Sequence, residues 1–173
     1  YIKEVKSLML TVFTRDDIFE LPAHEAIKKL SLVTNNYTII NTLLIRRDDG
    51  NIISDRQVMY EVFGEEQIDQ IIEETNLEAN IITYTDPYFS AISKKRTIYF
   101  TLTDQKSNRL VVVELNLDYL HHNMLQILDG KKQMFVITTN ANQILTFDRG
   151  ASPIPLKKQV YPLEIAHEYE RLI

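Results

Sequence analysis

Hydrophobic residues recur every three or four positions in four stretches of the chain, and this spacing predicts an amphipathic helix in each of them. The stretches are residues 1–13, 22–34, 65–75 and 117–128. In the first stretch the apolar stripe consists of Ile2, Val5, Leu8, Met9, Val12 and Phe13. A short last helix is predicted from Pro162, because proline suits a first helical turn.

Runs rich in β-branched residues and lacking a helical period predict strands at positions 37–46, 52–54, 97–104, 109–116, 133–139 and 144–148. Asp49-Gly50 predicts a hairpin turn after the first run, because glycine adopts the required positive φ at low cost. Short turns also join the later pairs of runs, which favours an antiparallel sheet. The fold class is therefore α+β, with long N-terminal helices packed on a central antiparallel sheet.

The strand at 97–104 has two sides of different chemistry. Its apolar side consists of Ile98, Phe100 and Leu102. Every residue of the other side carries a hydroxyl group, namely Thr97, Tyr99, Thr101 and Thr103. Two interpretations fit this pattern. The hydroxyl side is either a solvent-facing edge or the wall of a ligand pocket, where a few polar groups orient the ligand.

Glu114 is the second candidate feature, because it lies late in the strongly apolar run "RLVVVELN". A charged side chain there is costly to bury unless it is paired, so it either belongs to a binding site or lies at the strand end in water. A polar-aromatic cluster that precedes the hydroxyl strand completes a candidate concave site, with Arg96 or Arg47 as the partner of a ligand carboxylate. The cluster consists of Tyr84, Asp86 and Tyr88.

Composition and charge exclude several classes of function. The 173 residues carry a net charge of −5 with the signs mixed, and the only dense basic run is Lys94-Lys95-Arg96, so no nucleic-acid partner is expected. The chain has no cysteine, which excludes disulfides, thiolate catalysis and cysteine-ligated metals. Its glycines fall at turns, its histidines lack metal-ligand spacing, and no serine elbow is present. We expect no catalysis, no cofactor and no metal in this chain.

Two segments resemble Cache-type sensor domains, the extracytoplasmic relatives of PAS domains. "INTLLIRRDDGNIISD" is similar to their opening hairpin, and "YTDPYFSAISKKRTIYFTLTDQKSNRLVVVELNLDYLHHNM" is similar to their middle. Asp86-Pro87-Tyr88, Ile98 to Leu102 and Val111 to Leu120 match three family motifs in order, with Glu114 at the usual acidic position. The similarity covers residues 37 to 148.

The resemblance implies a ligand-sensing domain on the extracellular or periplasmic face of the membrane. The full protein would be a membrane-anchored receptor, and the favoured class is a sensor histidine kinase of a two-component system. A homodimer contact is expected along the first helix. The implied organisation is an N-terminal helical segment at 1–36, a PAS-like sensor module at 37–130, and a hairpin and helix at 131–173 that complete this module or start another. Because the chain begins at Tyr1 rather than methionine, we expect a fragment of a longer protein.

The resemblance also predicts the site and one departure from the family. A small-molecule ligand is expected at Tyr84, Asp86, Tyr88, Arg96, Tyr99, Thr101 and Glu114. The amino-acid-binding subgroup resembles "R-x-W-Y", whereas this chain has no tryptophan and offers only Arg56 and Tyr60, so an amino-acid ligand is not supported. Two alternatives stay open: a ligand-free dimerisation or protein-interaction module of such a receptor, and a cytosolic PAS-like regulatory domain.

Overall fold

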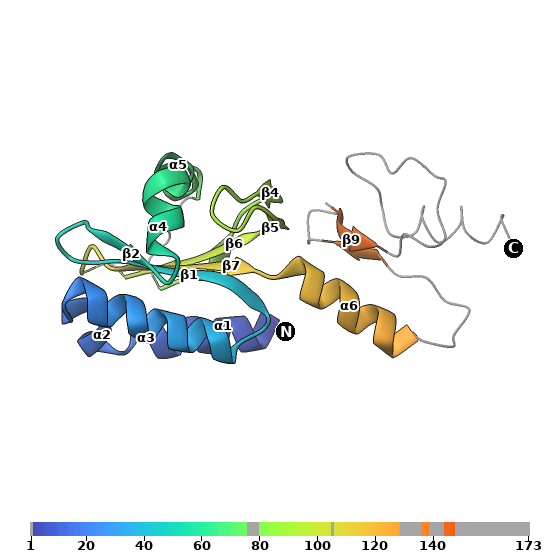
Figure 1. Ribbon diagram of the computed structural model, residues 1–173, viewed down its shortest axis with the longest axis horizontal. Helices are drawn as coiled ribbons and strands as arrows, with labels where there is room; N and C mark the ends of the chain where they lie inside the picture. The colour runs from blue at the N-terminus through green and yellow to red at the C-terminus, as the bar shows by residue number, and fades with distance from the viewer. Residues whose placement is uncertain (1, 76–79, 105, 129–135, 139–143, 148–173) are drawn as a thin grey trace, which may run out of the picture. The chain divides into compact units, whose positions relative to one another are not determined.

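A computed structural model describes residues 2–75, 80–104, 106–128, 136–138 and 144–147 (Figure 1). The chain divides into two compact units, Tyr1–Asn116 and Leu117–Ile173, which are described separately. No helix of the described residues is long and apolar enough to cross a membrane.

The first unit is built on a five-stranded antiparallel sheet with the strand order β2-β1-β7-β6-β3. The strands are β1 (Ile40–Arg46), β2 (Ile52–Ser54), β3 (Thr83–Tyr84), β6 (Tyr99–Thr103) and β7 (Leu110–Leu115). The predicted turn between β1 and β2 is confirmed, with Gly50 at φ 86°. The helices and this sheet confirm the predicted α+β class.

Three helices cover one face of the sheet (Figure 1). They are α1 (Ile2–Phe13), α2 (Asp16–Glu20) and α3 (Ala23–Asn36), and α1 and α3 confirm the two predicted N-terminal helices. The buried stripe of α1 consists of Val5, Leu8, Met9 and Val12. The sequence did not predict α2, which begins at Asp16 and buries Ile18 and Phe19.

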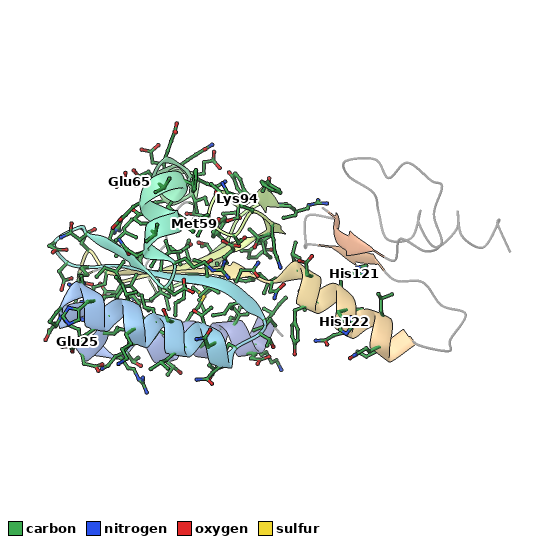
Figure 2. The ribbon with its side chains drawn as sticks, in the orientation of Figure 1. Glu25, Met59, Glu65, Lys94, His121 and His122 are labelled. Carbon is green, nitrogen blue, oxygen red and sulfur yellow. The ribbon has the colours of Figure 1, made fainter. Side chains whose placement is uncertain are left out.

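A helix and a small hairpin cover the opposite face. The helix starts at Gln57, earlier than predicted, and consists of α4 (Gln57–Met59), the π-helix η1 (Tyr60–Gly64) and α5 (Glu65–Glu74). The hairpin consists of β4 (Tyr88–Phe89) and β5 (Arg96–Thr97). Figure 2 shows Met59, Glu65 and Lys94 on this side of the sheet and Glu25 of α3 on the other.

Glycine allows the hairpin to approach the helix closely. A Cβ atom at Gly64 would lie 2.6 Å from Cγ1 of Ile92, which belongs to the hairpin loop. The two elements and the sheet share a hydrophobic cluster, called here the upper core, of Leu44, Tyr60, Ile68, Ile71, Ile92, Tyr99, Leu110 and Val112.

The second unit contains α6 (Leu117–Leu128) and the antiparallel pair β8 (Val136–Thr138) and β9 (Ile144–Phe147). These elements confirm the helix and the hairpin that the sequence predicts there. The helix predicted from Pro162 lies outside the described residues.

Candidate ligand-binding site

The hydroxyl side of β6 faces the upper core. Directly paired residues of antiparallel strands share one face of a sheet. Tyr99 is paired with Glu114 of β7, and Glu114 is paired with Thr42 of β1, so all three lie on the face that α5 and the hairpin cover. Thr97, Tyr99, Thr101 and Thr103 are all buried, so the interpretation as a solvent-facing edge is wrong.

The strand predicted at 97–104 divides into β5, which ends at Thr97, and β6, which begins at Tyr99, and its threonines form structural hydrogen bonds. Thr97 Oγ1 donates to the carbonyl of Leu115 at 2.6 Å, and Thr103 Oγ1 donates to the carbonyl of Arg109 at 2.9 Å. Thr101 Oγ1 lies 2.6 Å from Thr83 Oγ1 on the edge strand β3. Tyr99 is the member of the series whose hydroxyl reaches across to the hairpin and to α5.

Four residues lie around Glu114, namely Thr42, Ser90, Ser93 and Tyr99, and together with Glu114 we call them the Glu114 cluster. Ser90 Oγ donates to Glu114 Oε2 at 2.8 Å, and the Tyr99 hydroxyl donates to Ser90 Oγ at 2.9 Å. The same hydroxyl lies 3.4 Å from Glu114 Oε2. Ser90 Oγ also accepts the backbone N–H groups of Ile92 and Ser93, at 3.1 and 3.0 Å.

One carboxylate oxygen of Glu114 has no hydrogen-bond partner among the described residues. Ser90 has a single hydroxyl proton, and it goes to Oε2 because the other groups around Ser90 Oγ donate to it. Glu114 Oε1, Ser93 Oγ and Thr42 Oγ1 are buried without a hydrogen-bond partner among the described residues. Such atoms are rare in native proteins, and each one needs a physical explanation.

Glu114 is fully buried, with 0% of its surface exposed, so the interpretation as a water-exposed strand end is wrong. Burial raises the pKa of its carboxyl group above the usual value, and the nearby side chains of Ser93, Ser90 and Asn41, together with the charge of Arg56, only partly offset this. A carboxyl group in this state gains from any cation that reaches Oε1, since an opposite charge favours its ionised form.

Gln67 of α5 holds the hairpin over the cluster. Its Nε2 donates to the carbonyl of Phe89 at 2.9 Å, and its Oε1 accepts the N–H of Ala91 at 2.7 Å. The Tyr99 hydroxyl lies 3.3 Å from the same Oε1. One amide side chain thus connects the helix, the hairpin backbone and the cluster.

The other predicted site residues lie away from the cluster. Tyr84 is 45% exposed and is paired with Phe100, which places it on the sheet face of α1–α3. Asp86 is exposed in the loop between β3 and β4, and Arg96 is exposed on β5. Tyr88 packs at the border of the upper core and donates its hydroxyl to Glu74, which raises the pKa of Tyr88 to about 12.

Four residues of this region were missed by the sequence reasoning: Thr42, Gln67, Ser90 and Ser93. Ser90 and Ser93 directly follow the Asp86-Pro87-Tyr88 motif, and this proximity is the one signal that points to them. Gln67 lies on a helix whose outer face is acidic, so its pattern indicates only a solvated surface. Thr42 is brought to the site by its pairing with Glu114.

Solved structures with the same fold are sensory domains of bacterial chemoreceptors. The isoleucine-bound sensory domain of Campylobacter jejuni Tlp3 aligns with a TM-score of 0.59 at 13% identity, over 96% of this chain and 71% of that domain. The L-leucine complex of Pseudomonas fluorescens CtaA aligns with a TM-score of 0.57 at 16% identity, over 83% of this chain and 61% of that domain. The GABA complex of Pseudomonas aeruginosa PctC aligns with a TM-score of 0.50 at 14% identity, over 83% of this chain and 64% of that domain.

These likenesses define the fold class. The chain has the fold of Cache-type sensory domains, as its motifs predicted, and it spans 61% to 71% of the length of the three domains compared. It matches no family model and no curated protein.

Proposed function

We propose that this chain is a non-catalytic, ligand-sensing domain of a bacterial signal-transduction receptor, and that it binds a small molecule through a protonated amine. One observation carries the proposal: Glu114 is buried in a Cache-type fold with Oε1 unpartnered among the described residues. An ammonium group has three N–H donors and accepts none. It therefore suits Glu114 Oε1 together with the unpartnered hydroxyl oxygens of Ser93 and Thr42.

The ligands of the structural neighbours are amino acids, which share a primary amine and a carboxylate. Isoleucine, L-leucine and GABA, which those domains hold, all carry a primary amine. This shared amine is consistent with a cation bound at the unpartnered Glu114 Oε1. Arg96, which was predicted to pair with a ligand carboxylate, is exposed on β5, whereas the charge of Arg56 acts on the Glu114 carboxyl group in the direction that lowers its pKa.

The wider receptor is proposed on the same basis. The domain lies on the extracellular or periplasmic face, the full protein is membrane-anchored, and α1 forms the dimer contact. The chemoreceptor neighbours favour a chemotaxis output over the histidine kinase that the motifs first suggested. A ligand shifts such a receptor only if it binds one of two conformations more tightly than the other.

Calorimetry with the purified chain tests the amine site. L-Leucine, L-isoleucine, GABA and alkylammonium chlorides are titrated at pH 7.5, and at least one is expected to bind the wild type and not Glu114→Gln. Saturation at about 100 times Kd should add about 2.7 kcal/mol to the unfolding free energy. Asp55→Asn is the matched control, because Asp55 is a second carboxyl group whose pKa burial raises. The proposal fails if no amine binds, or if Glu114→Gln binds as the wild type does.

A protein-interaction module is the second candidate, and a groove between α1 and α3 favours it. The groove has a volume of about 390 Å³ and is lined in part by Leu8, Val12, Ile18, Leu32 and Val33. Leu32, which lines the groove, is 56% exposed, and Leu10 of α1 is 51% exposed. Sedimentation of the wild type and of Leu10→Glu across a dilution series tests this candidate, which predicts a dimer that the substitution dissociates.

A further inference from the structure

The groove between α1 and α3 is a concave region of the first unit, and it lies on the sheet face opposite Glu114 (Figure 1). Its volume of about 390 Å³ falls within the ~300–1,000 Å³ of small-ligand pockets. Residues three or four positions apart share one face of a helix, so each helix contributes one wall. The walls include Leu8, Thr11 and Val12 of α1 and Lys29, Leu32 and Asn36 of α3.

The two charged residues of the lining are both cations, and they lie at the same end of the groove. Arg15 directly precedes α2, and Lys29 Nζ lies 2.6 Å from Oδ2 of Asp17, a residue of α2. This contact brings Lys29 of α3 to the end where α1 leads into α2. None of the described residues that line the groove is acidic, although the chain carries a net charge of −5.

Arg15 is the cation that remains available to a ligand. Lys29 is already paired, since its hydrogen bond is the largest cause of the lowered pKa of Asp17, to which the charge of Arg15 contributes less. Arg15 forms no salt bridge with any described side chain. A guanidinium group is planar and binds a carboxylate through two parallel N–H donors. This end of the groove therefore favours an anion, and a carboxylate in particular.

The rest of the lining favours an apolar body. Thr11 Oγ1 donates to the carbonyl of Ser7, and Asn36 Nδ2 donates to the carbonyl of Leu32, both at 2.8 Å, so these two side chains bind back to their own helices. Val12 is buried in the wall of α1, whereas Leu32 is 56% exposed. An alkyl chain in the groove would cover Leu32, and this burial of apolar surface favours binding.

We propose that the α1–α3 groove binds an alkyl carboxylate of medium chain length, with the carboxylate at Arg15 and the alkyl chain along Val12 and Leu32. This site is separate from the proposed amine site at Glu114 and does not depend on it. A second copy of the chain fits the groove less well. In a symmetric dimer the same patch meets itself, and the contact would bring the cations of two grooves together.

The test is a chain-length series measured by calorimetry with the purified chain. Sodium hexanoate, octanoate and decanoate are titrated at pH 7.5 and constant ionic strength, at concentrations below micelle formation. Affinity should rise by roughly threefold to fourfold for each added methylene group, because each one buries further apolar surface. Octan-1-ol has the same chain length as octanoate without the charge, and it should bind more weakly.

Two pairs of variants assign the head and the body of the ligand. Arg15→Gln should lower octanoate affinity by roughly twofold to fivefold, the range for exposed ion pairs, and should leave octan-1-ol affinity unchanged. Lys28→Gln is its control, because Lys28 is exposed on α3 outside the lining. Leu32→Glu should abolish octanoate binding, whereas Leu10→Glu, which alters an exposed leucine of α1 outside the lining, should retain it.

The outcomes separate this site from the amine site. Glu114→Gln should bind octanoate as the wild type does, and loss of octanoate binding in this variant would place the carboxylate elsewhere and overturn the proposal. Equal losses in Arg15→Gln and Lys28→Gln, or binding that survives in Leu32→Glu, would overturn it as well. If no carboxylate of the series binds, the proposal is wrong. A dimer that Leu32→Glu dissociates in sedimentation would then assign the groove to a second copy. None of these results bears on amine binding at Glu114.

Discussion

The two faces of the central sheet differ in what they bury. The face under α1–α3 presents apolar strand residues, and all of them are buried: Leu43, Ile45, Phe100, Leu102, Val111 and Val113. The face under α5 and the hairpin mixes Leu44 and Val112 with Thr42, Tyr99 and Glu114, which are buried to the same degree. One sheet therefore carries an ordinary core on one side and a polar interior on the other.

The composition of the two faces indicates that the apolar face serves stability and the polar face serves recognition. Burying a polar group without a partner costs roughly 1–3 kcal/mol on the scale of protein mutations, so a face that served packing alone would replace such groups by apolar ones. The face of α1–α3 follows that rule. The opposite face breaks it at Glu114 Oε1, Ser93 Oγ and Thr42 Oγ1, and local departures of this kind are expected at functional sites.

The largest effect is expected from a cavity in the apolar face. Leu43 has no exposed surface, and Leu43→Ala should lower the unfolding free energy by about 2–5 kcal/mol, from lost burial and from the cavity left behind. Urea unfolding measures this loss. Amine binding below the unfolding transition should match the wild type, and a large loss of affinity in the folded variant would show that the two faces are not separate in function.

Glu114→Gln should have the opposite effect on stability. The folded pKa of Glu114 is raised above 4.5, so its favourable contribution is complete below pH 4.5 and is lost as the pH rises through the folded pKa. The glutamine side chain does not titrate. At pH 8 the variant should therefore have a higher unfolding free energy than the wild type by about 1–3 kcal/mol, the usual cost of an unmatched buried polar group.

The measurement is the difference in unfolding free energy between Glu114→Gln and the wild type from pH 4 to pH 8. Because both proteins share all other titrating groups, the difference isolates Glu114. It should grow with pH, whereas a difference that is constant or shrinks would mean that the carboxylate is satisfied when ionised. Amine affinity in the wild type should rise over the same range, since the cation binds the ionised form.

Regular elements were predictable from the sequence, and elements that depend on docking were not. Helix α1 and the β6–β7 pair follow from unbroken periods of apolar residues, and the Gly50 turn follows from the conformation that glycine permits. The helix start at Gln57 was missed because the π-helical turn at Tyr60–Gly64 interrupts the 3.6-residue period. Strands β3 and β4 span two residues each, which is too short for any period to register.

The same division holds within the site. Glu114 and Tyr99 could be predicted as site residues because each is a polar residue within a regular strand pattern. Ser90 and Gln67 reach the cluster only because the hairpin docks on α5, through contacts between residues 22 to 24 positions apart. No local pattern encodes such a contact, so the sequence could identify the carboxylate but not the groups that surround it.

Gln67→Ala tests whether the hairpin is held over the polar face as the structure indicates. The substitution removes the acceptor of the Ala91 N–H and the donor to the Phe89 carbonyl, and should lower the unfolding free energy by about 1–2 kcal/mol. Gln70→Ala is the matched control on the same helix, because the Gln70 amide contacts Glu74 one turn away and such pairs contribute about 0.2–0.5 kcal/mol. Equal losses in the two variants would argue against a special role for Gln67.

The smallest effect concerns the outer contact of the hairpin. Lys94 Nζ lies 4.0 Å above the ring of Phe63, and the pair joins the hairpin loop to η1 at the surface. A double-mutant cycle of Lys94→Met and Phe63→Leu should give a coupling of about 0.5–1 kcal/mol, the range for exposed cation–π pairs. Because this contact lies outside the Glu114 cluster, neither substitution should alter the affinity for amines. If Lys94→Met lowers the unfolding free energy as strongly as Gln67→Ala does, the Lys94–Phe63 contact supports the hairpin as much as the Gln67 hydrogen bonds do.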